Sequence, residues 1–177
     1  MTRVPPATSD GPVAQRIRER RGGTLTPLDQ ALLHSEAFAD GWNALLGAVR
    51  SRMDLPGHLR ELVICRIAAL NGAEYEWRAH APLALHEGLT AEQVAALQPG
   101  ADPAPLNDLH RLVIDYTDAM THDVTVPDRL SDALHELLGT QQLVELTGTI
   151  AAYNMVSRFL VALHVGQPRI EEGEVPA

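Results

Sequence analysis

The sequence predicts an all-α protein that forms a single domain. Its 177 residues are enough for one domain with a core of its own and too few for two. Hydrophobic residues make up 45% of the chain and aromatic residues only 4%, so the core must consist mainly of alanine, leucine and valine. Such side chains favour close helix packing over a β-sandwich. Apolar residues also recur at helical spacing, which gives the same prediction.

Three segments are expected along the chain. Residues 1–23 contain several prolines and glycines with scattered charge, a composition that buries little apolar surface and predicts a flexible N-terminal arm. Residues 24–167 form the predicted helical domain, and residues 168–177 form an acidic tail. The basic residues of the arm are predicted to be solvated: Arg16, Arg18, Arg20 and Arg21.

Four helices are predicted in the first half of the domain. Thr26 is a candidate N-cap with a proline after it, and a second helix begins at Ser35. Pro56 begins the third helix, which Gly72 ends, and a fourth spans about 74–87. One face of the second helix is predicted to consist of Phe38, Trp42, Leu45, Leu46 and Val49, with Trp42 in the core.

Four more helices are predicted in the second half. Thr90 and Gln93 have the spacing of a capping box, which begins a short helix that reaches about residue 97. The other helices are predicted at about 105–121, 127–138 and 141–165. The last of these carries polar residues within apolar surroundings.

Charge and cysteine content exclude several classes of protein. The formal net charge of −9 repels phosphate backbones and anionic lipid surfaces, so neither nucleic acid nor a membrane is expected as a partner. No long apolar run follows the N-terminal arginines, which argues against a signal peptide or membrane anchor. With Cys65 as the single cysteine, no internal disulfide or CxxC pair can form, and a cytoplasmic location is expected.

The polar chemistry is concentrated where the helices at 56–70 and 74–87 meet. Glu61 and Cys65 lie on one stripe of the first helix, and Glu76 and His80, four residues apart, share a stripe of the second. A carboxylate beside an imidazole orients the ring and favours its protonated form, as a general acid requires. By spacing alone, an ordinary surface Glu-His pair is an equally open interpretation.

Together the motifs of this region resemble the carboxymuconolactone decarboxylase family, which includes alkylhydroperoxidase D. The resemblance spans about residues 30–167 and depends on these stretches: 59–64 (LRELVI), 68–72 (AALNG), 75–77 (YEW), His80, 88–90 (GLT), 143–147 (LVELT) and 150–159. It implies an alkylhydroperoxidase D-like helical bundle that assembles as a dimer, trimer or hexamer. The resemblance also implies that no cofactor or metal is used.

The chain departs from the peroxidase members at their two cysteines. Those members have a glutamate, a CxxC pair and a histidine four residues after the second cysteine. Glu61 and His80 match the glutamate and the histidine, whereas Ala73 and Glu76 occupy the cysteine positions. Without an attacking and a resolving thiol, peroxidase chemistry by that route is excluded. Cys65 lies in an apolar run, where an inert buried thiol is expected.

The predicted function is therefore that of a cofactor-independent lyase acting on a small activated carboxylic acid or lactone. His80 is the expected proton donor, oriented by Glu76, and Glu61 is expected to relay protons or hold the ring from its other side. Open alternatives are a non-catalytic ligand-binding or interaction protein, a peroxidase using Cys65 with a partner thiol, and a metal enzyme with Glu61, Glu76 and His80 as ligands. Candidate substrate-binding residues are Tyr75, Trp77, Tyr116, Asn154 and Arg158, and also Arg66.

Overall fold

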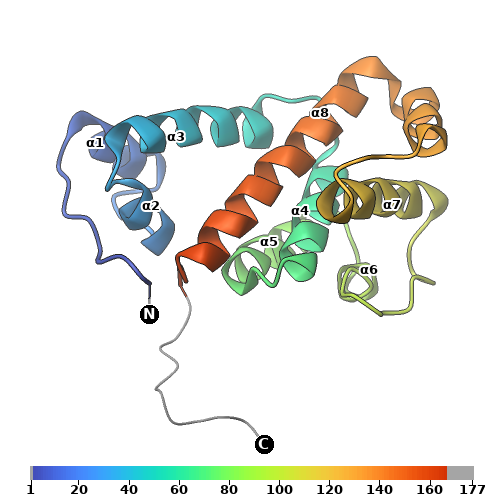
Figure 1. Cartoon of the computed structure of the whole chain (residues 1–177), viewed down its shortest axis with the longest axis horizontal. Coiled ribbons are helices and arrows are strands. Elements are labelled where there is room, and N and C mark those ends of the chain that lie inside the picture. Colours follow the sequence, from blue (N-terminus) through green and yellow to red (C-terminus); the bar gives the residue numbers. More distant parts are fainter. Residues whose placement is uncertain (1, 167–177) are drawn as a thin grey trace, which may run out of the picture.

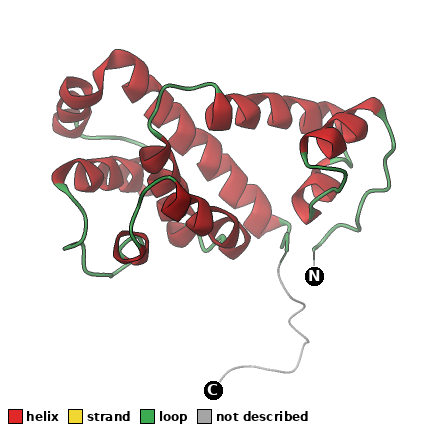
Figure 2. Cartoon of the chain, turned by 180° about the vertical axis from the view of Figure 1, so that it is seen from behind, coloured by secondary structure: helices red, strands yellow, loops and turns green. Residues whose placement is uncertain are grey.

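The structure is a computed structural model that describes residues 2–166, and within that range it contains eight helices and no strand (Figures 1 and 2). The prediction of an all-α single domain is thus confirmed. The predicted tail at 168–177 lies outside the described residues. The helices are α1 (Pro12–Arg20), α2 (Pro27–Leu32), α3 (Glu36–Ser51), α4 (Gly57–Leu70), α5 (Glu74–His86), α6 (Ala91–Ala95), α7 (Asp108–His122) and α8 (Asp128–Ala162).

Helix α4 lies at the centre of the bundle and packs against α5, α7 and α8. Its residues Leu62, Val63, Ile64 and Cys65 are all fully buried. A helix that is apolar all round needs neighbours on every side, which explains this position. Helix α8 crosses the molecule diagonally, with α1, α2 and α3 on one side and α6 and α7 on the other (Figure 1).

Most predicted helix boundaries agree with the structure, and the differences have local causes. Helix α7 begins at Asp108 instead of about residue 105, because the Asn107 side chain accepts a hydrogen bond from the backbone N–H of His110 and caps the helix there. The two helices predicted on either side of Gly139 are both present within α8, and the kink that separates them lies at Gly139, where φ is +76°.

The prediction that the N-terminal arm has no regular structure is wrong. Residues 12–20 form α1, which packs against α3. Ala14 and Ile17, at helical spacing, are buried in the common core. Their two apolar side chains were too few to stand out among the surrounding arginines, prolines and glycines.

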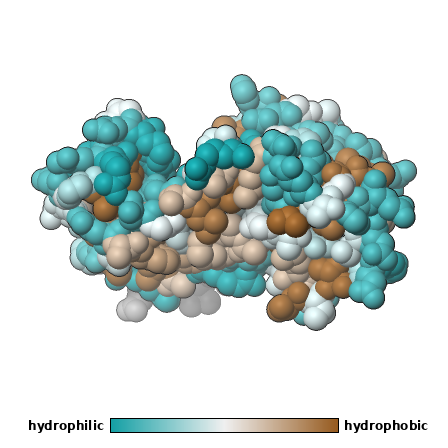
Figure 3. Space-filling view, turned by 90° about the horizontal axis from the view of Figure 1, so that it is seen from above, coloured by the Kyte–Doolittle hydropathy of each residue, from teal (hydrophilic) through white to brown (hydrophobic). Residues whose placement is uncertain are grey.

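The predicted apolar face of α3 is only partly buried. Trp42, Leu46 and Val49 lie in the core, as predicted, but Phe38 and Leu45 are about half exposed. The edge of Phe38 packs against Trp42, with the ring centroids 5.6 Å apart. Seen from above, the surface carries hydrophobic side chains scattered among hydrophilic ones (Figure 3).

No helix in residues 2–166 combines the length and apolar character needed to cross a membrane.

Candidate active site

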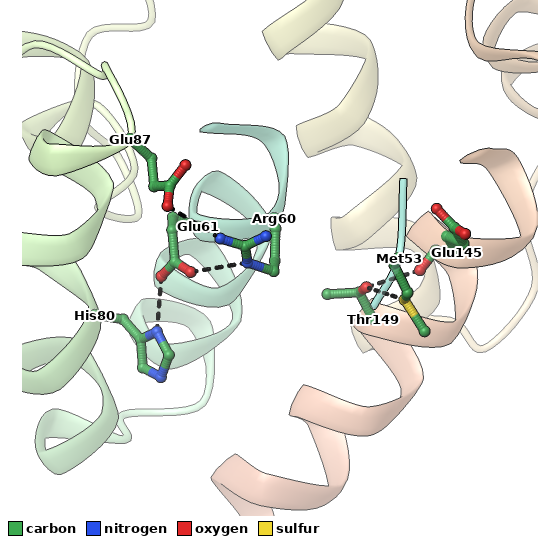
Figure 4. Close-up of polar contacts among 7 residues, drawn as sticks. All are labelled: Met53, Arg60, Glu61, His80, Glu87, Glu145 and Thr149. Atoms are coloured by element: carbon green, nitrogen blue, oxygen red, sulfur yellow. Dashed lines mark hydrogen bonds and ion pairs between the residues drawn. The ribbon is translucent and has the colours of Figure 1, made fainter. Parts of the chain in front are cut away.

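Helices α4 and α5 bring Glu61 and His80 together. The two helices are joined by a tight turn at Asn71 and Gly72, in which Gly72 adopts a left-handed φ of +63°. Helix α5 therefore returns along α4, and Nδ1 of His80 lies 2.7 Å from Oε2 of Glu61 (Figure 4). The predicted proximity of these two side chains is present in the structure.

A second contact fixes the carboxylate of Glu61. Nε of Arg60 lies 3.1 Å from Oε1 of Glu61, and Nη2 of Arg60 lies 3.3 Å from Oε1 of Glu87 (Figure 4). Glu61 itself is 2% exposed. A buried carboxylate held between a guanidinium and an imidazole favours a proton on Nδ1 of His80. Nε2 is then the ring nitrogen available for a ligand.

Glu76 does not orient His80, contrary to the expectation from sequence. Its carboxyl group is buried, and neither oxygen has a hydrogen-bond partner within residues 2–166. Burial raises the pKa of Glu76 well above its ordinary value of 4.5, because the charged form loses its hydration. Burial therefore favours the neutral form of the Glu76 carboxyl group. The contact that orients His80, expected from Glu76, comes from Glu61.

Tyr153 of α8 completes the polar group. Its ring meets His80 edge to face, with centroids 5.3 Å apart and an interplanar angle of 86°. The hydroxyl is buried. Burial raises the pKa of Tyr153, while the charge of nearby Arg50 and a side-chain hydrogen bond from it partly oppose that effect. Sequence reasoning had assigned no role to this tyrosine.

A cavity of about 340 Å³ adjoins His80, Glu76 and Tyr153. Its volume suits a small molecule. The walls are mixed in character: α3 and α8 contribute apolar side chains, and α1, with the loop after it, contributes arginines. The remaining lining residues are Arg20, Arg21, Thr26, Leu28, Trp42, Leu46, Arg50, Tyr75, Ala79, Leu83, Val156 and Leu160.

The arginines make one side of this cavity cationic. Arg21 pairs with the buried Asp29 at 2.5 Å, and Nη2 of Arg20 donates to the side-chain oxygen of Asn43 at 2.7 Å. Arg50 forms no ion pair with a carboxylate within residues 2–166. Partial burial, with the charges of Arg21 and Arg50 nearby, lowers the pKa of Arg20. Arg16 is exposed, as expected, but Arg20 and Arg21 belong to a helical segment and line the cavity, so the expectation of a solvated arm is only partly met.

Of the predicted substrate-binding residues, only Tyr75 lines this cavity. Trp77 is partly buried against the core, and Tyr116 bonds to Thr147 at 2.9 Å. Asn154 donates to Thr121 at 3.0 Å, and Arg158 bonds to Asn154. None of these four side chains lines the cavity, and their contacts are with the core or with other helix residues.

Arg66 also has a structural role. Its Nε and Nη2 atoms bond both oxygens of Asp118, at 2.8 and 2.5 Å, and Nη1 donates to the carbonyl of Leu97 at 2.9 Å. The guanidinium is thereby occupied, which leaves it unsuited to hold a substrate carboxylate at this position.

Cys65 has the environment expected of an inert thiol. It is fully buried, and desolvation, to which the charge of Glu61 adds, raises the pKa of the thiol to about 12. The metal alternative also lacks a geometric basis. Within residues 2–166, no group of three or more His, Cys, Asp or Glu side chains is placed to hold a metal ion.

The fold and the site thus define an all-α bundle with a carboxylate-histidine pair at a cavity. Residues 36–105 match the sequence model of the carboxymuconolactone decarboxylase family. The resemblance to that family is confirmed. The matched segment contains α3, α4, α5 and α6, and so includes Glu61, Glu76 and His80 but neither α1 nor Tyr153.

Two solved structures share the fold. One is a protein of unknown function from Agrobacterium tumefaciens with a suggested role as the antioxidant defence protein AhpD: 22% identity, 75% of this chain and 90% of that chain covered, TM-score 0.66. The other is an uncharacterized peroxidase-related protein from Silicibacter sp. TM1040: 15% identity, 98% and 95% covered, TM-score 0.78. At these identities the likeness shows the fold alone. No curated protein matches the chain.

Proposed function

We propose that the cavity beside His80 is the active site of a cofactor-independent lyase that removes carbon dioxide from a small activated carboxylic acid or lactone. The observation that supports this proposal is the Glu61–His80 contact at 2.7 Å at the wall of a cavity of about 340 Å³. A Glu-His pair on the surface would not adjoin a cavity of this kind. A pair with only a structural role would leave no space for a ligand beside the histidine.

The chemistry requires an acid and a place for developing charge. When the carbon–carbon bond to the carboxylate breaks, its electron pair moves into the adjacent conjugated carbonyl and leaves an enolate. A proton must then reach carbon. The doubly protonated ring of His80 delivers this proton from Nε2, while Glu61 accepts a hydrogen bond from Nδ1–H and holds the ring in place. The ring is left neutral with its proton on Nδ1, and solvent then protonates Nε2 again. Glu76 and Tyr153 add neutral O–H donors that can stabilise the enolate oxygen.

The neighbours in fold include a peroxidase-related protein, so peroxidase activity is the competing candidate. In this chain Ala73 and Glu76 stand where a thiol pair would be needed, and Cys65 is buried with a raised pKa. These features favour the acid–base reaction.

The test is a screen for carbon dioxide release. The enzyme is mixed with γ-carboxymuconolactone, β-keto acids and vinylogous acids, and the variant His80→Ala is compared with His86→Ala, a change at an exposed histidine of the same helix. We expect turnover that falls about 100-fold or more in His80→Ala, the range for losing a general acid. His86→Ala should match wild type. An absence of turnover on every substrate, or equal rates for both variants, would sink the proposal.

Self-association is a second part of the proposal. Phe38 and Leu45 on α3, and Leu83 and Leu85 on α5, are large hydrophobic side chains that remain about half exposed. Apolar groups of this size favour burial against another surface. Light scattering coupled to size-exclusion chromatography is expected to give a dimer, trimer or hexamer mass, and a monomer mass at micromolar concentration would contradict it.

A further inference from the structure

We propose that Arg50, together with Arg20, forms a carboxylate-binding subsite at the side of the cavity bounded by α1 and α3, so that the ligand is an anion with an apolar body. This inference rests on the proposed function, because it takes the bound carboxylate to be the substrate of the proposed lyase. It assigns to the N-terminal helix, which lies outside the family-matched segment, a direct part in ligand selection.

The charge balance of the cavity supports an anionic ligand. Three arginines line it, and Asp29 neutralises mainly Arg21, whose Nε lies 2.5 Å from the carboxylate. The closest approach of Arg20 to Asp29 is 4.0 Å, and Arg50 has no ion pair within residues 2–166. Glu76, also in the lining, is deeply buried, which disfavours its charged form. The cavity is thus locally positive in a chain whose formal net charge is −9.

Positive groups held close together cost free energy unless an anion joins them. Partial burial is the main cause that lowers the pKa of Arg20, and the charges of Arg21 and Arg50 lower it further. A bound carboxylate would relieve that repulsion and could accept paired hydrogen bonds from a guanidinium. Arg20 already donates to Asn43 and lies 4.0 Å from Asp29, whereas Arg50 has only the neutral Tyr153 hydroxyl beside it and no carboxylate partner within residues 2–166, so Arg50 has the better claim as anchor.

The remaining walls define the rest of the ligand. Trp42, Leu46, Val156 and Leu160 are apolar and buried, and they lie in the same cavity as the arginines and His80. A ligand that satisfies all of these contacts has a carboxylate at one end and an apolar or unsaturated body. Neutral analogues lack the charge that Arg50 recognises, so they should bind less tightly.

The experiment measures binding and needs no turnover. Benzoate, phenylacetate and 3-phenylpropanoate, and the primary amide of each, are titrated by calorimetry into the full chain. The variants are Arg50→Met and Arg50→Lys, and the matched control is Arg16→Met, because Arg16 pairs with Asp40 and lies outside this cavity. Circular dichroism shows whether each variant is folded.

We expect at least one carboxylate to bind wild type more tightly than its amide. Arg50→Met should weaken that carboxylate by about 10-fold or more, as expected for a charge-assisted hydrogen bond, and should leave the amide unchanged. Arg50→Lys should lose less affinity for the carboxylate, and Arg16→Met should bind it as tightly as wild type does. Equal binding of carboxylates and amides, an undiminished affinity in Arg50→Met, or no binding of any probe at millimolar concentration would overturn the subsite.

The outcomes separate this subsite from the lyase proposal. Carboxylate binding that depends on Arg50, without carbon dioxide release from any substrate, would support the subsite and remove the lyase. Turnover that depends on His80 but is unaffected by Arg50→Met would keep the lyase and remove the subsite.

Discussion

Nδ1 of His80 lies 2.7 Å from Oε2 of Glu61, although the two residues are nineteen positions apart and belong to different helices. The contact depends on the turn at Gly72, which directs α5 back along α4. Arg60 holds the other oxygen of the same carboxylate at 3.1 Å. The carboxylate is therefore fixed on both sides, and it determines which ring nitrogen of His80 carries the proton.

Replacing Glu61 with glutamine is expected to reverse the tautomer of His80. Arg60 favours the amide oxygen on its own side, so the amide NH₂ faces Nδ1 of His80 and can only donate to it. The neutral ring then carries its proton on Nε2 and accepts the amide hydrogen bond at Nδ1, so the doubly protonated ring that acts as the proton donor is disfavoured. We expect turnover to fall about 100-fold, and nitrogen NMR of the imidazole to report the change of tautomer.

The control for this change is Glu87→Gln, which alters a second contact of Arg60 without touching His80. Unchanged imidazole nitrogen shifts in Glu61→Gln would contradict the orienting role of Glu61.

Glu76 is expected to make the protein less stable as the pH rises. In the folded chain its pKa lies well above 4.5, so above pH 4.5 the unfolded chain binds fewer protons at this residue than the folded chain. The free energy of unfolding then declines by about 1.4 kcal/mol per pH unit until the pH reaches the folded pKa. Glu76→Gln removes this titration. The free energy of unfolding of the variant, relative to wild type, should therefore rise between pH 5 and pH 7, a range that begins just above the ordinary pKa of a glutamate.

Urea unfolding across that pH range measures the difference. Glu74→Gln, at an exposed position of the same helix, serves as the control and should show a nearly constant difference from wild type. A constant difference for Glu76→Gln as well would show that the carboxyl group is already ionised in the fold.

Cys65 is expected to resist thiol reagents in the folded protein. With full burial and a pKa raised to about 12, little thiolate forms at pH 8 and the reagent cannot reach it. Labelling with a disulfide reagent should proceed only as fast as the chain opens, and should become rapid in urea. Fast labelling under native conditions, or turnover lost in Cys65→Ala, would revive the peroxidase alternative.

Arg66→Met is expected to lower stability without affecting the cavity. The guanidinium is 13% exposed and makes two bonds to Asp118 and one to the Leu97 carbonyl. Its loss should reduce the free energy of unfolding by about 1–3 kcal/mol, the range for hydrogen bonds to charged groups. Binding of carboxylate probes should remain at the wild-type level, and a weakened affinity would instead place Arg66 in ligand recognition.

The helices and the acid–base residues could be predicted from sequence because their signals are local. Thr26, Thr90 and Gly72 mark helix ends through capping and φ preference, which depend on a few neighbouring residues. Periodic apolar residues mark the helices themselves. The family resemblance then identified Glu61 and His80, the pair that the structure brings together in the candidate active site.

The side-chain contacts between different helices could not be predicted in the same way. Glu76 shares a helical stripe with His80, so spacing favoured that pair, but packing against α4 gives the contact to Glu61 and leaves Glu76 buried alone. Tyr153 reaches His80 from α8, about seventy residues later. Helical periodicity says which face a side chain occupies, and it does not say which helix covers that face.

The sequence by itself determined the all-α class, the positions of most helix ends and the absence of a CxxC pair, because composition, capping and residue identity are properties of the chain. Only the tertiary structure decided that α1 is ordered, that Arg20, Arg21 and Arg50 meet at a cavity, and that Glu61 is the partner of His80. Those relationships come from packing between segments far apart in sequence. That packing is favoured because it buries apolar surface and also pairs buried charges.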